Sequence, residues 1–433
     1  MTDIKFWKPA YQLFKHDVPL MDEDLKNFYV RRDDSPVDSL VTTLTMEDQP
    51  AKFLLSGHRG GGKTTELKRL EAQSLADYTV VWVDTELSLE QFNIGYAEVI
   101  ILIGKTIVER LAEVGWKLPR KLEQGLLESL AKVTYEDKLI GGGKIELPKL
   151  FTDLGLLLRV GFDRTTTRVR EVRPALSDIV NRVNTIIEIA EADTGTKLLV
   201  MVDGLDRKER EVALEMFSSS LLTSLSCHIV YVVPISLRYS TAFQQPMENF
   251  SACLDLDNIP VFKCNDQRQP TVEEDRVGRH ILKSVIAKRL GTLGDAYKDL
   301  FAADALELMC EKSGGVMRDL VRLARMACTV ASKKRASKID VAIVKDAIRE
   351  VRRIYSIEDY HFPELVLVHR TGKRSSNTFD VPSKGTIVIC DELLHHRLIL
   401  GYRDPDRGRW FDVHPILMDD LNRWQAANPS PLP

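Results

Sequence analysis

The sequence predicts an α/β fold in which a parallel sheet carries helices on both faces and is followed by a helical lid and a winged-helix-like C-terminal domain. Three observations support this prediction. From residue 52 onward, short apolar runs rich in β-branched residues alternate with helical segments. From residue 272 to residue 354 the apolar spacing is helical throughout. Near the C-terminus, a helix-like run leads into two short strands joined by a turn.

The composition is that of a globular protein. Of the 433 residues, 44% are hydrophobic and 28% are charged, so we expect two or three domains with ample cores. The net charge of −3 excludes a global attraction to nucleic acid, although not a local patch. The six cysteines are scattered without a Cys-x-x-Cys pair, which indicates reduced thiols rather than disulfides or a zinc site. The N-terminus lacks a signal-peptide core, and apolar runs such as 99–103 are too short for a bilayer, so we expect a cytoplasmic protein without a membrane segment.

The sheet is predicted from four buried strands at 52–56, 78–84, 197–203 and 228–235. Residues 1–50 form a polar and aromatic lead-in to the first strand. The long interval between the second and third strands shows helical periodicity at 90–113, 118–132 and 174–191, which we interpret as a mostly helical insertion. Within this interval, residues 134–172 are compatible with either a hairpin or a mobile segment.

Four helices are predicted after the sheet, at 274–290, 295–312, 316–333 and 338–354. The run from Ser337 to Asp340 resembles a capping box that opens the last of them. A helix at 390–399 then leads into a hairpin that turns at 404–408, as in a winged helix. We therefore divide the chain into a lead-in (1–50), a sheet domain (51–271) with its insertion at about 90–190, a helical lid (272–357) and a winged-helix-like domain (358–433).

A glycine-rich loop between the first strand and the next helix is the most informative motif. The residues Gly57, His58, Arg59, Gly60, Gly61, Gly62, Lys63 and Thr64 match the phosphate-binding pattern G-x-x-x-x-G-K-[ST] in full. Backbone N–H groups of such a loop, and of the helix that Thr65 continues, point at phosphate oxygens. Lys63 is expected to reach the β- and γ-phosphates and Thr64 to hold Mg²⁺. This predicts the P-loop NTPase fold class; the alternative is a glycine-rich turn that binds nothing.

A carboxylate at the end of the third strand is the second expected element of the site. Four apolar residues lead to Asp203, which we expect beside the first strand, where it orients water on Mg²⁺. Asp206 is the nearest further carboxylate that could polarise the attacking water, and its alternative role is the N-cap of a helix at 207–219. Glu209 is a second candidate for the catalytic role, although we expect it to begin that helix.

Three more residues are candidates for sensing the γ-phosphate. Ser236 and Arg238 follow the fourth strand, although Arg238 fits a solvated loop position equally well. Arg318 falls in the first turn of the helix at 316–333, where a cation opposes the helix dipole. That conflict suggests that a bound phosphate, rather than the helix, explains why an arginine stands at this position. The alternative is an ordinary surface arginine.

In this order the four motifs resemble Walker A, Walker B, sensor 1 and sensor 2 of the AAA+ and STAND ATPases. The resemblance covers about residues 25–355, and the winged-helix unit fits it too. The motif Asp-Gly-Leu-Asp at 203–206 and the long insertion are closer to those of STAND and KAP-type proteins, although the chain lacks the membrane segments of KAP-type proteins. In motors of the family a glutamate stands where this chain has Gly204, which argues against fast hydrolysis.

The resemblance implies ATP and Mg²⁺ as cofactors. It assigns phosphate and Mg²⁺ to Lys63 and Thr64, and Mg²⁺ to Asp203. By the same resemblance, Asp206 assists hydrolysis and Arg318 contacts the γ-phosphate from the helical lid. The lead-in is then expected to pack near the nucleotide base.

We therefore expect an ATP-binding and ATP-hydrolysing switch that controls oligomerisation or a partner protein. By analogy, bacterial-type ATPases of this kind serve phage defence or mobile-element control.

The alternative is an ATP-dependent DNA-binding protein that uses its winged helix. Residues 361–433 contain nine Lys/Arg and nine Asp/Glu, whereas a DNA reader usually has a basic face; three arginines do lie between 403 and 409. The five histidines of this segment include no helical i, i+4 pair, so no zinc site is expected. A kinase or GTPase is disfavoured, because the Asn-Lys-x-Asp guanine motif is absent.

Overall fold

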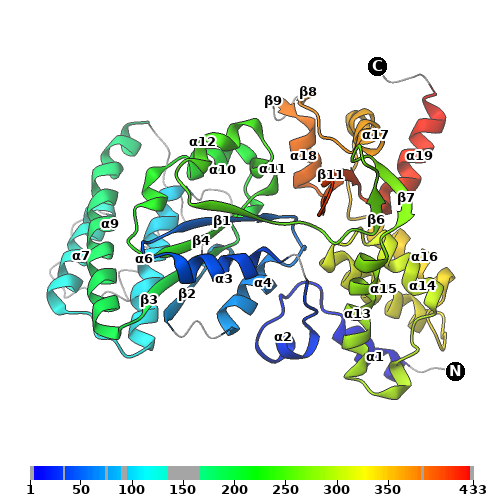
Figure 1. The fold of residues 1–433 in the computed structure, drawn as a ribbon, viewed down its shortest axis with the longest axis horizontal. Coiled ribbons are helices and arrows are strands. Elements are labelled where there is room, and N and C mark those ends of the chain that lie inside the picture. The colour runs from blue at the N-terminus through cyan, green and yellow to red at the C-terminus, as the bar shows by residue number, and fades with distance from the viewer. Residues whose placement is uncertain are drawn as a thin grey trace. The chain divides into compact units, whose positions relative to one another are not determined.

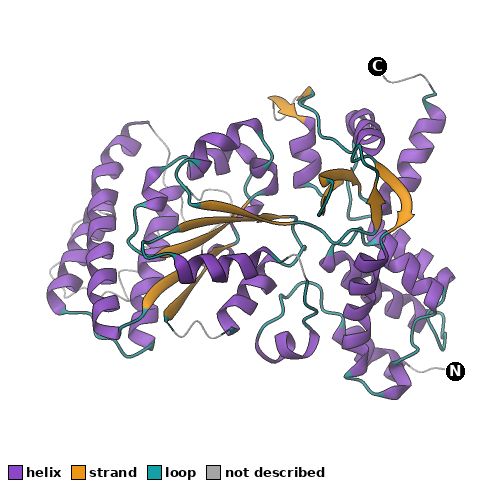
Figure 2. Cartoon of the chain, in the orientation of Figure 1, coloured by secondary structure: helices purple, strands orange, loops and turns teal. Residues whose placement is uncertain are grey.

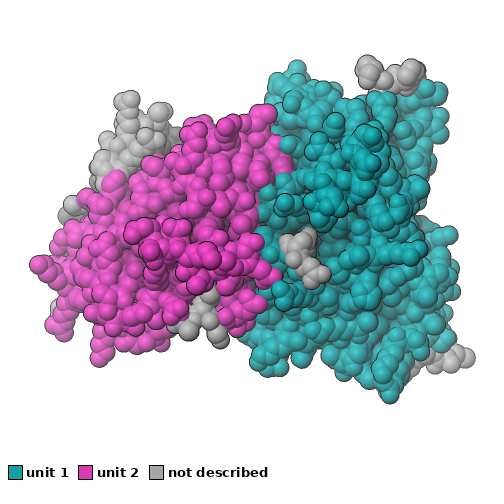
Figure 3. Space-filling view, in the orientation of Figure 1, with its two compact units in different colours: residues 1–36, 57–69, 255–433 teal, residues 37–56, 70–254 magenta. Residues whose placement is uncertain are grey.

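The computed structural model describes residues 4–32, 35–73, 77–88, 95–134, 166–381 and 385–429. The chain divides into two compact units, shown in different colours in Figure 3. The first unit contains residues 1–36, 57–69 and 255–433, and the second contains residues 37–56 and 70–254. Every helix in the described ranges is too short or too polar to cross a membrane.

A five-stranded sheet forms the centre of the second unit (Figure 1). The strand order is β2-β3-β4-β1-β5, and the pairs β2/β3, β3/β4 and β4/β1 are parallel. The strands are β1 (Lys52–Gly57), β2 (Tyr78–Asp84), β3 (Lys197–Asp203), β4 (His228–Val233) and β5 (Ala252–Leu256). The four predicted strands are therefore confirmed, with β4 two residues shorter than expected, and β5 is an additional strand.

Both faces of the sheet are buried, because its strands are apolar at successive positions. Leu54 of β1, Val200 of β3 and Tyr231 of β4 join one core with residues of the flanking helices α6 and α9. The intervening residues Leu55, Met201 and Val232 are buried as well. Strands covered on both sides are typical of a parallel sheet, and Figure 2 shows helices around the strands.

The position of the third strand corrects one expectation. We expected Asp203 to end a strand beside β1, but β4 lies between β1 and β3. The sequence does not specify strand order, because consecutive strands joined by helices can insert on either side of a neighbour. The register is nevertheless well defined, since Asp84 at the end of β2 lies opposite Asp203 at the end of β3.

The helical insertion is confirmed for the part that is described. It contains α6 (Tyr96–Glu113), α7 (Arg120–Thr134) and α9 (Thr166–Thr194), and α9 packs against both α6 and α7. The predicted hairpin or mobile segment at 134–172 lies largely outside the described residues. The second unit also contains α3 (Pro36–Met46), α5 (Thr85–Ser88), α10 (Arg210–Phe217), α11 (Ile235–Arg238) and α12 (Gln244–Met247), while α4 (Lys63–Ala72) belongs mostly to the first unit.

The first unit contains the predicted helical region. Its helices are α13 (Arg276–Gly291), α14 (Ala303–Lys312), α15 (Met317–Lys333) and α16 (Val341–Arg352). The helix expected at 295–312 is interrupted, because a 3₁₀ turn at Asp295–Tyr297 precedes α14. The capping-box prediction at Ser337 was wrong: Asp340 is the N-cap of α16, and its carboxylate accepts a hydrogen bond from the Ile343 N–H. The lead-in contributes α1 (Ile4–Leu13), which packs on α15, and α2 (Asp22–Phe28).

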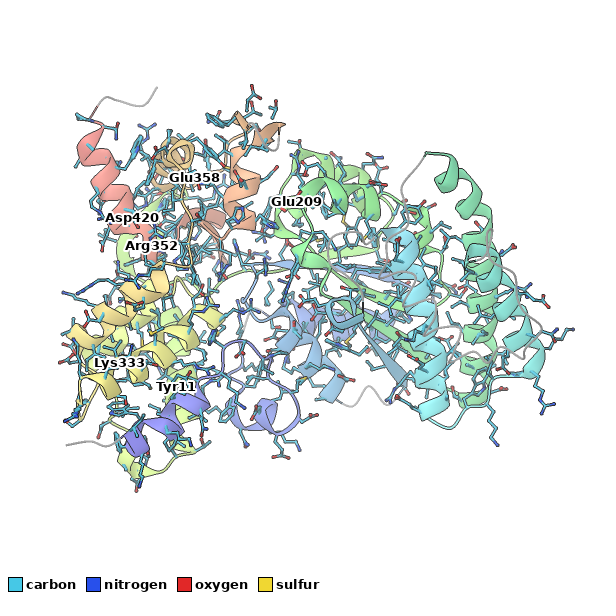
Figure 4. All side chains as sticks on the ribbon, turned by 180° about the vertical axis from the view of Figure 1, so that it is seen from behind. Tyr11, Glu209, Lys333, Arg352, Glu358 and Asp420 are labelled. Atoms are coloured by element: carbon cyan, nitrogen blue, oxygen red, sulfur yellow. The ribbon has the colours of Figure 1, made fainter. Side chains whose placement is uncertain are left out.

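The C-terminal part of this unit has the predicted helix followed by a hairpin. Helix α18 (Ile389–His395) precedes the antiparallel strands β10 (Ile399–Asp404) and β11 (Gly408–Val413). Around them lie α17 (Phe362–Thr371), α19 (Met418–Ala427) and the hairpins β6 (Phe262–Cys264)–β7 (Pro270–Glu274) and β8 (Thr378–Val381)–β9 (Gly385–Val388). Arg352 of α16 forms an ion pair with Asp420 of α19, and the two are labelled side by side in Figure 4. The division into four domains proposed from the sequence stays a prediction, because the two compact units do not test it.

Candidate functional site

The glycine-rich loop lies in the expected strand–loop–helix setting. Strand β1 ends at Gly57 and α4 begins at Lys63. The buried Lys63 ammonium donates hydrogen bonds to the carbonyl oxygens of Gly57, at 2.8 Å, and His58, at 3.1 Å. The N–H of Gly61 also donates to the His58 carbonyl, at 3.0 Å. The loop is therefore curled tightly around the lysine, as a phosphate-binding loop must be.

Helix α15 begins against this loop. The N–H of Arg318 donates to the carbonyl oxygen of Gly60 at 3.0 Å. Gly60 has a φ of +84°, and a Cβ at this position would lie 2.6 Å from the Arg318 Cβ. Only glycine allows both this backbone conformation and this close approach. The structure thus places Arg318 in the first turn of its helix, as predicted, and beside the loop.

The Arg318 guanidinium lies among other cations. Burial lowers its pKa, and Arg397, Arg59 and Arg322 lower it further. Arg322 and Arg397 both pair with the fully buried Asp319, each at 2.8 Å. Among the described residues, no carboxylate pairs with Arg318. A half-buried cation in this position is electrostatically suited to an anion at the loop.

His58 connects the loop to the C-terminal hairpin, a contact that the sequence analysis missed. Its Nε2 atom accepts a hydrogen bond from the Gly401 N–H of β10 at 2.9 Å, so the ring is neutral and carries its proton on Nδ1. Burial holds the His58 pKa well below its usual range, and Lys63, Arg397 and His414 lower it further. An imidazole in a glycine-rich loop has no sequence signal that would name its partner.

The lead-in packs on the loop and on α4. The Arg32 guanidinium donates to the Gly61 carbonyl at 3.4 Å. The hydroxyls of Tyr29 and Ser35 donate to the two carboxylate oxygens of Glu66, at 3.0 and 2.7 Å. The predicted phosphate ligand Thr65 uses its hydroxyl to accept the Leu20 N–H, at 3.3 Å. The lead-in is thus placed beside the phosphate loop, while its expected contact with a nucleotide base stays a prediction.

A second group of candidate residues lies at the carboxyl end of the sheet in the second unit. One Asp203 carboxylate oxygen accepts the Gly204 N–H, and the Thr85 hydroxyl donates to the Asp203 carbonyl, both at 2.8 Å. Glu86, which follows β2, has its pKa raised by burial and by nearby Asp206, Asp84 and Asp203, while Arg207 lowers it. Four carboxylates therefore share this strand end.

Asp206 does not cap a helix. It lies in the 3₁₀ turn Leu205–Arg207, and Glu209 is the residue that precedes α10 (Figure 4). The N-cap alternative for Asp206 was therefore wrong, because the helix begins at Arg210 rather than at 207. The expectation that Glu209 begins the helix is correct.

Ser236 and Arg238 lie in the short helix α11 that follows β4, not at the end of a longer strand. The Ser236 hydroxyl is buried without a hydrogen-bond partner among the described residues. The Arg238 guanidinium lies 5.0 Å from the Phe243 ring centroid and 5.6 Å from that of Tyr239. Arg238 therefore packs against two nearby aromatic rings, and its sensor role stays a prediction.

The donors available for Mg²⁺ are hard oxygens. Asp203 offers a carboxylate whose orientation is held by the Gly204 N–H. No described cluster of three or more His, Cys, Asp or Glu side chains has the geometry of a metal cage. Mg²⁺ typically keeps several waters and takes one or two carboxylates together with phosphate oxygens, so the Asp203 carboxylate is a ligand of the kind that this ion takes.

Comparisons with known proteins give structural neighbours only. No family model matches the chain, and no curated protein sequence matches it. The ORC2 protein of Aeropyrum pernix, solved in ADPNP–ADP complexes, is 13% identical, with a TM-score of 0.44 over 97% of this chain and 98% of the other. A Walker-type ATPase of Pyrococcus abyssi is 15% identical, with a TM-score of 0.44 over 95% and 99%. The RuvB Holliday junction branch migration motor of Thermotoga maritima is 13% identical, with a TM-score of 0.38 over 97% and 100%. Since these TM-scores are below 0.5, the function proposed below rests on the chain's own residues.

Proposed function

We propose that this protein binds and hydrolyses ATP with Mg²⁺, as an ATPase of the AAA+ and STAND type. The placement of Arg318 carries the proposal. Its backbone is bonded to Gly60 of the phosphate loop, and its guanidinium lies among Arg59 and Arg397 with no carboxylate partner among the described residues. Cations gathered beside a glycine-rich loop favour a ligand with several negative charges, such as a triphosphate.

Each candidate residue has a role in this proposal. The N–H groups of residues 57–64 and the Lys63 ammonium bind the phosphates, while Arg318 contacts the γ-phosphate. The family resemblance assigns Mg²⁺ to Thr64 and Asp203, and the bound ion would neutralise charge on the phosphates. A carboxylate near Asp203 must also accept the proton of the attacking water, and from the sequence this is Asp206.

The hydrogen bond between His58 and Gly401 supports coupling between the loop and the C-terminal hairpin. A change at the loop on nucleotide binding would alter this contact, because both partners are buried. The further proposal that this switch controls oligomerisation or a partner protein, in phage defence or mobile-element control, rests on the family resemblance alone.

DNA binding by the hairpin is the weaker candidate. Arg407 pairs with Asp266 at 2.9 Å and with Asp404 at 3.3 Å. Arg409 makes a two-pronged ion pair with Asp257, at 3.0 and 2.9 Å. Two of the three arginines that favoured DNA are therefore bound to carboxylates of the protein itself.

Nucleotide titrations test the proposal. Full-length protein is mixed with ATP, ADP and GTP in the presence of Mg²⁺, and affinity and phosphate release are measured with and without duplex DNA. We expect ATP to bind more tightly than GTP, and Asp203→Asn to lose most of the Mg²⁺ dependence of ATP binding. Wild-type protein that binds neither ATP nor GTP would contradict the proposal. Turnover that requires DNA would instead favour the DNA-binding candidate.

A further inference from the structure

A buried carboxylate lies among the arginines at the start of α15. Asp319 directly follows Arg318 in the helix, and its side chain is fully buried. Its Oδ1 atom accepts a hydrogen bond from the Arg322 guanidinium and its Oδ2 atom accepts one from the Arg397 guanidinium, both at 2.8 Å. These residues and the glycine-rich loop all belong to the first compact unit. Of the three arginines, Arg318 is the one for which the described residues provide no carboxylate partner.

Neutral donors complete the surroundings of Asp319. The Tyr355 hydroxyl donates to Oδ2 at 2.7 Å, and the His414 Nε2 atom lies 3.5 Å from the same oxygen. The His414 Nδ1 atom accepts the Ile416 N–H at 3.2 Å, so the ring proton is on Nε2, facing Asp319. Burial raises the pKa of Asp319, but the charge of Arg397 and the hydrogen bond from His414 lower it more, so the carboxylate is ionised.

Arg397 reaches Asp319 from the turn between α18 and β10. Its backbone has a φ of +59°, in the left-handed region, which is unfavourable for a residue with a Cβ. Its guanidinium carbon lies 5.3 Å from the centroid of the Tyr355 ring, and its side chain is 16% exposed. An arginine in an unfavourable backbone conformation, whose charge is paired with a carboxylate and lies against a ring, is held in one place by the protein.

The charge of Arg397 reaches the phosphate loop. It lowers the pKa of His58 in the loop and the pKa of Arg318 beside it. A second unpaired guanidinium at this place would attract the phosphates of ADP as well as those of ATP, because a diphosphate already carries several negative charges. Selectivity for a γ-phosphate therefore requires that Arg318 is unpaired and that Arg397 is paired.

We propose that Asp319 is a positioning residue that makes the phosphate loop prefer ATP to ADP. It holds Arg397 and Arg322 in ion pairs, which leaves Arg318 to bind the γ-phosphate. This assignment rests on the proposed ATP binding, and it concerns binding alone, with no bond made or broken. A purely structural carboxylate would instead affect ATP and ADP binding equally, through the stability of the fold.

The ratio of ATP affinity to ADP affinity, measured on the full chain by isothermal titration calorimetry with Mg²⁺, tests the assignment. In Asp319→Asn the side chain has one oxygen left to accept hydrogen bonds, so one of the two paired arginines is released. We expect the preference for ATP to fall about fivefold, with ADP bound at least as tightly as by wild type. In the double variant Asp319→Asn/Arg397→Ala the released charge is absent, and the preference should return to within about twofold of wild type.

Two further variants separate selectivity from folding, which is checked by the melting temperature. Tyr355→Phe removes a neutral donor from the same carboxylate oxygen, so it should lower the melting temperature and leave the preference for ATP unchanged. Arg397→Lys leaves Asp319 in place, so it serves as the test if Asp319→Asn does not fold. Lysine keeps the charge but lacks the planar group that pairs with the carboxylate and lies against the Tyr355 ring. We therefore expect Arg397→Lys to bind ADP about threefold more tightly.

The possible failures can be told apart. A folded Asp319→Asn with the wild-type preference overturns the assignment, as does wild-type ADP affinity in Arg397→Lys when Asp319→Asn does not fold. Equal losses of ATP and ADP affinity in Asp319→Asn that the double variant does not reverse would show a structural role, and would also overturn it. If wild type binds ATP and ADP equally, the assignment fails and nucleotide binding stands. If wild type binds neither, the proposed function fails first.

Discussion

The phosphate loop and the strand end that carries Asp203 are assembled in opposite ways. Cations from distant parts of the sequence lie near the loop. Arg397 lowers the pKa of His58 in the loop, and it also lowers the pKa of Arg318. The strand end gathers carboxylates from the residues that follow two neighbouring strands, among them Glu86 and Asp203. Each region has unfavourable like-charge contacts, of opposite sign.

This difference indicates what each region is suited to hold. Like charges that are kept together in a protein cost stability unless a ligand of opposite charge neutralises them. The charge of the loop region therefore favours an anion, and the charge of the strand end favours a cation. The following four predictions test this contrast, beginning with the largest expected effect.

Lys63→Ala should abolish most nucleotide binding. The ammonium is the buried cation at the centre of the loop, so its removal should weaken ATP affinity on the order of 100-fold, or about 3 kcal/mol. Isothermal titration calorimetry with ATP and Mg²⁺ measures the change. Lys298→Ala, at a 65% exposed side chain, is the control and should bind ATP as wild type does. Equal affinities in the two variants would show that the loop does not bind phosphate.

Gly204→Ala should destabilise the strand end. The new Cβ would collide with Thr85 and Glu86 in a left-handed backbone, which we expect to cost about 2–4 kcal/mol. Gly195→Ala is the matched control, because Gly195 has a φ of +68° and no atom within 4 Å of an added Cβ. It should cost only the conformational part, about 1–2 kcal/mol. Urea unfolding gives both values, and equal losses would mean that the side chains around Gly204 give way freely.

Arg318→Ala should reduce ATP affinity without reducing stability. We expect ATP to bind about tenfold more weakly and ADP to be nearly unaffected, because only ATP has the γ-phosphate. The melting temperature should be unchanged or higher, since burial and neighbouring arginines oppose the Arg318 charge. Arg322→Ala should leave the ATP affinity unchanged and lower the free energy of unfolding by about 1 kcal/mol, because it removes an ion pair to the buried Asp319. A loss of stability in Arg318→Ala comparable to that in Arg322→Ala would contradict the unbalanced charge at the loop.

The smallest effect concerns pH and His58. The folded-state pKa of His58 lies well below the ordinary value of 6.5, mainly because of burial, so the unfolded chain takes up the proton first. The contribution of His58 to stability is therefore complete above pH 6.5 and is lost as the pH falls toward the folded-state pKa. Between pH 7 and pH 5, the free energy of unfolding of wild type should fall more steeply than that of His58→Gln.

Urea unfolding at several pH values measures this difference. His280→Gln, at an exposed position of α13, is the control and should keep the wild-type slope. Equal slopes for wild type and His58→Gln would show that the imidazole is reached by solvent, and would weaken the proposed link between the loop and the hairpin.

Much of the fold was predictable because its signals are local. The strands β1 to β4 are continuous apolar runs, and the loop Gly57–Thr64 carries its pattern within eight residues. Helices α13 to α16 have helical apolar spacing that survives in the structure with boundary shifts of a few residues, apart from the break before α14. The helices of the lead-in were missed, although α1 and α3 have buried apolar residues at helical spacing. They are short helices that depend on packing, as α1 does on α15.

The candidate site was only partly predictable. Arg318 was identified because a cation in the first turn of a helix conflicts with the helix dipole, a conflict visible in the sequence. Glu86 was missed, although an acidic residue two positions after a strand that ends in Asp84 is a usable signal once the strand register is known. Asp203 was identified, yet its strand was placed beside β1 instead of beyond β4, because strand order is a property of the whole sheet.

The sequence by itself determined that a phosphate-binding loop joins a buried strand to a helix, and that an aspartate ends another strand of the same sheet. Those features depend on residue types at fixed spacing, which the chain displays directly. Only the tertiary structure decided that the Arg318 N–H donates to the Gly60 carbonyl, that His58 accepts the Gly401 N–H, and that Glu86 fills the space beside Gly204. These contacts join residues that are far apart in the chain, and the packing that produces them has no local pattern.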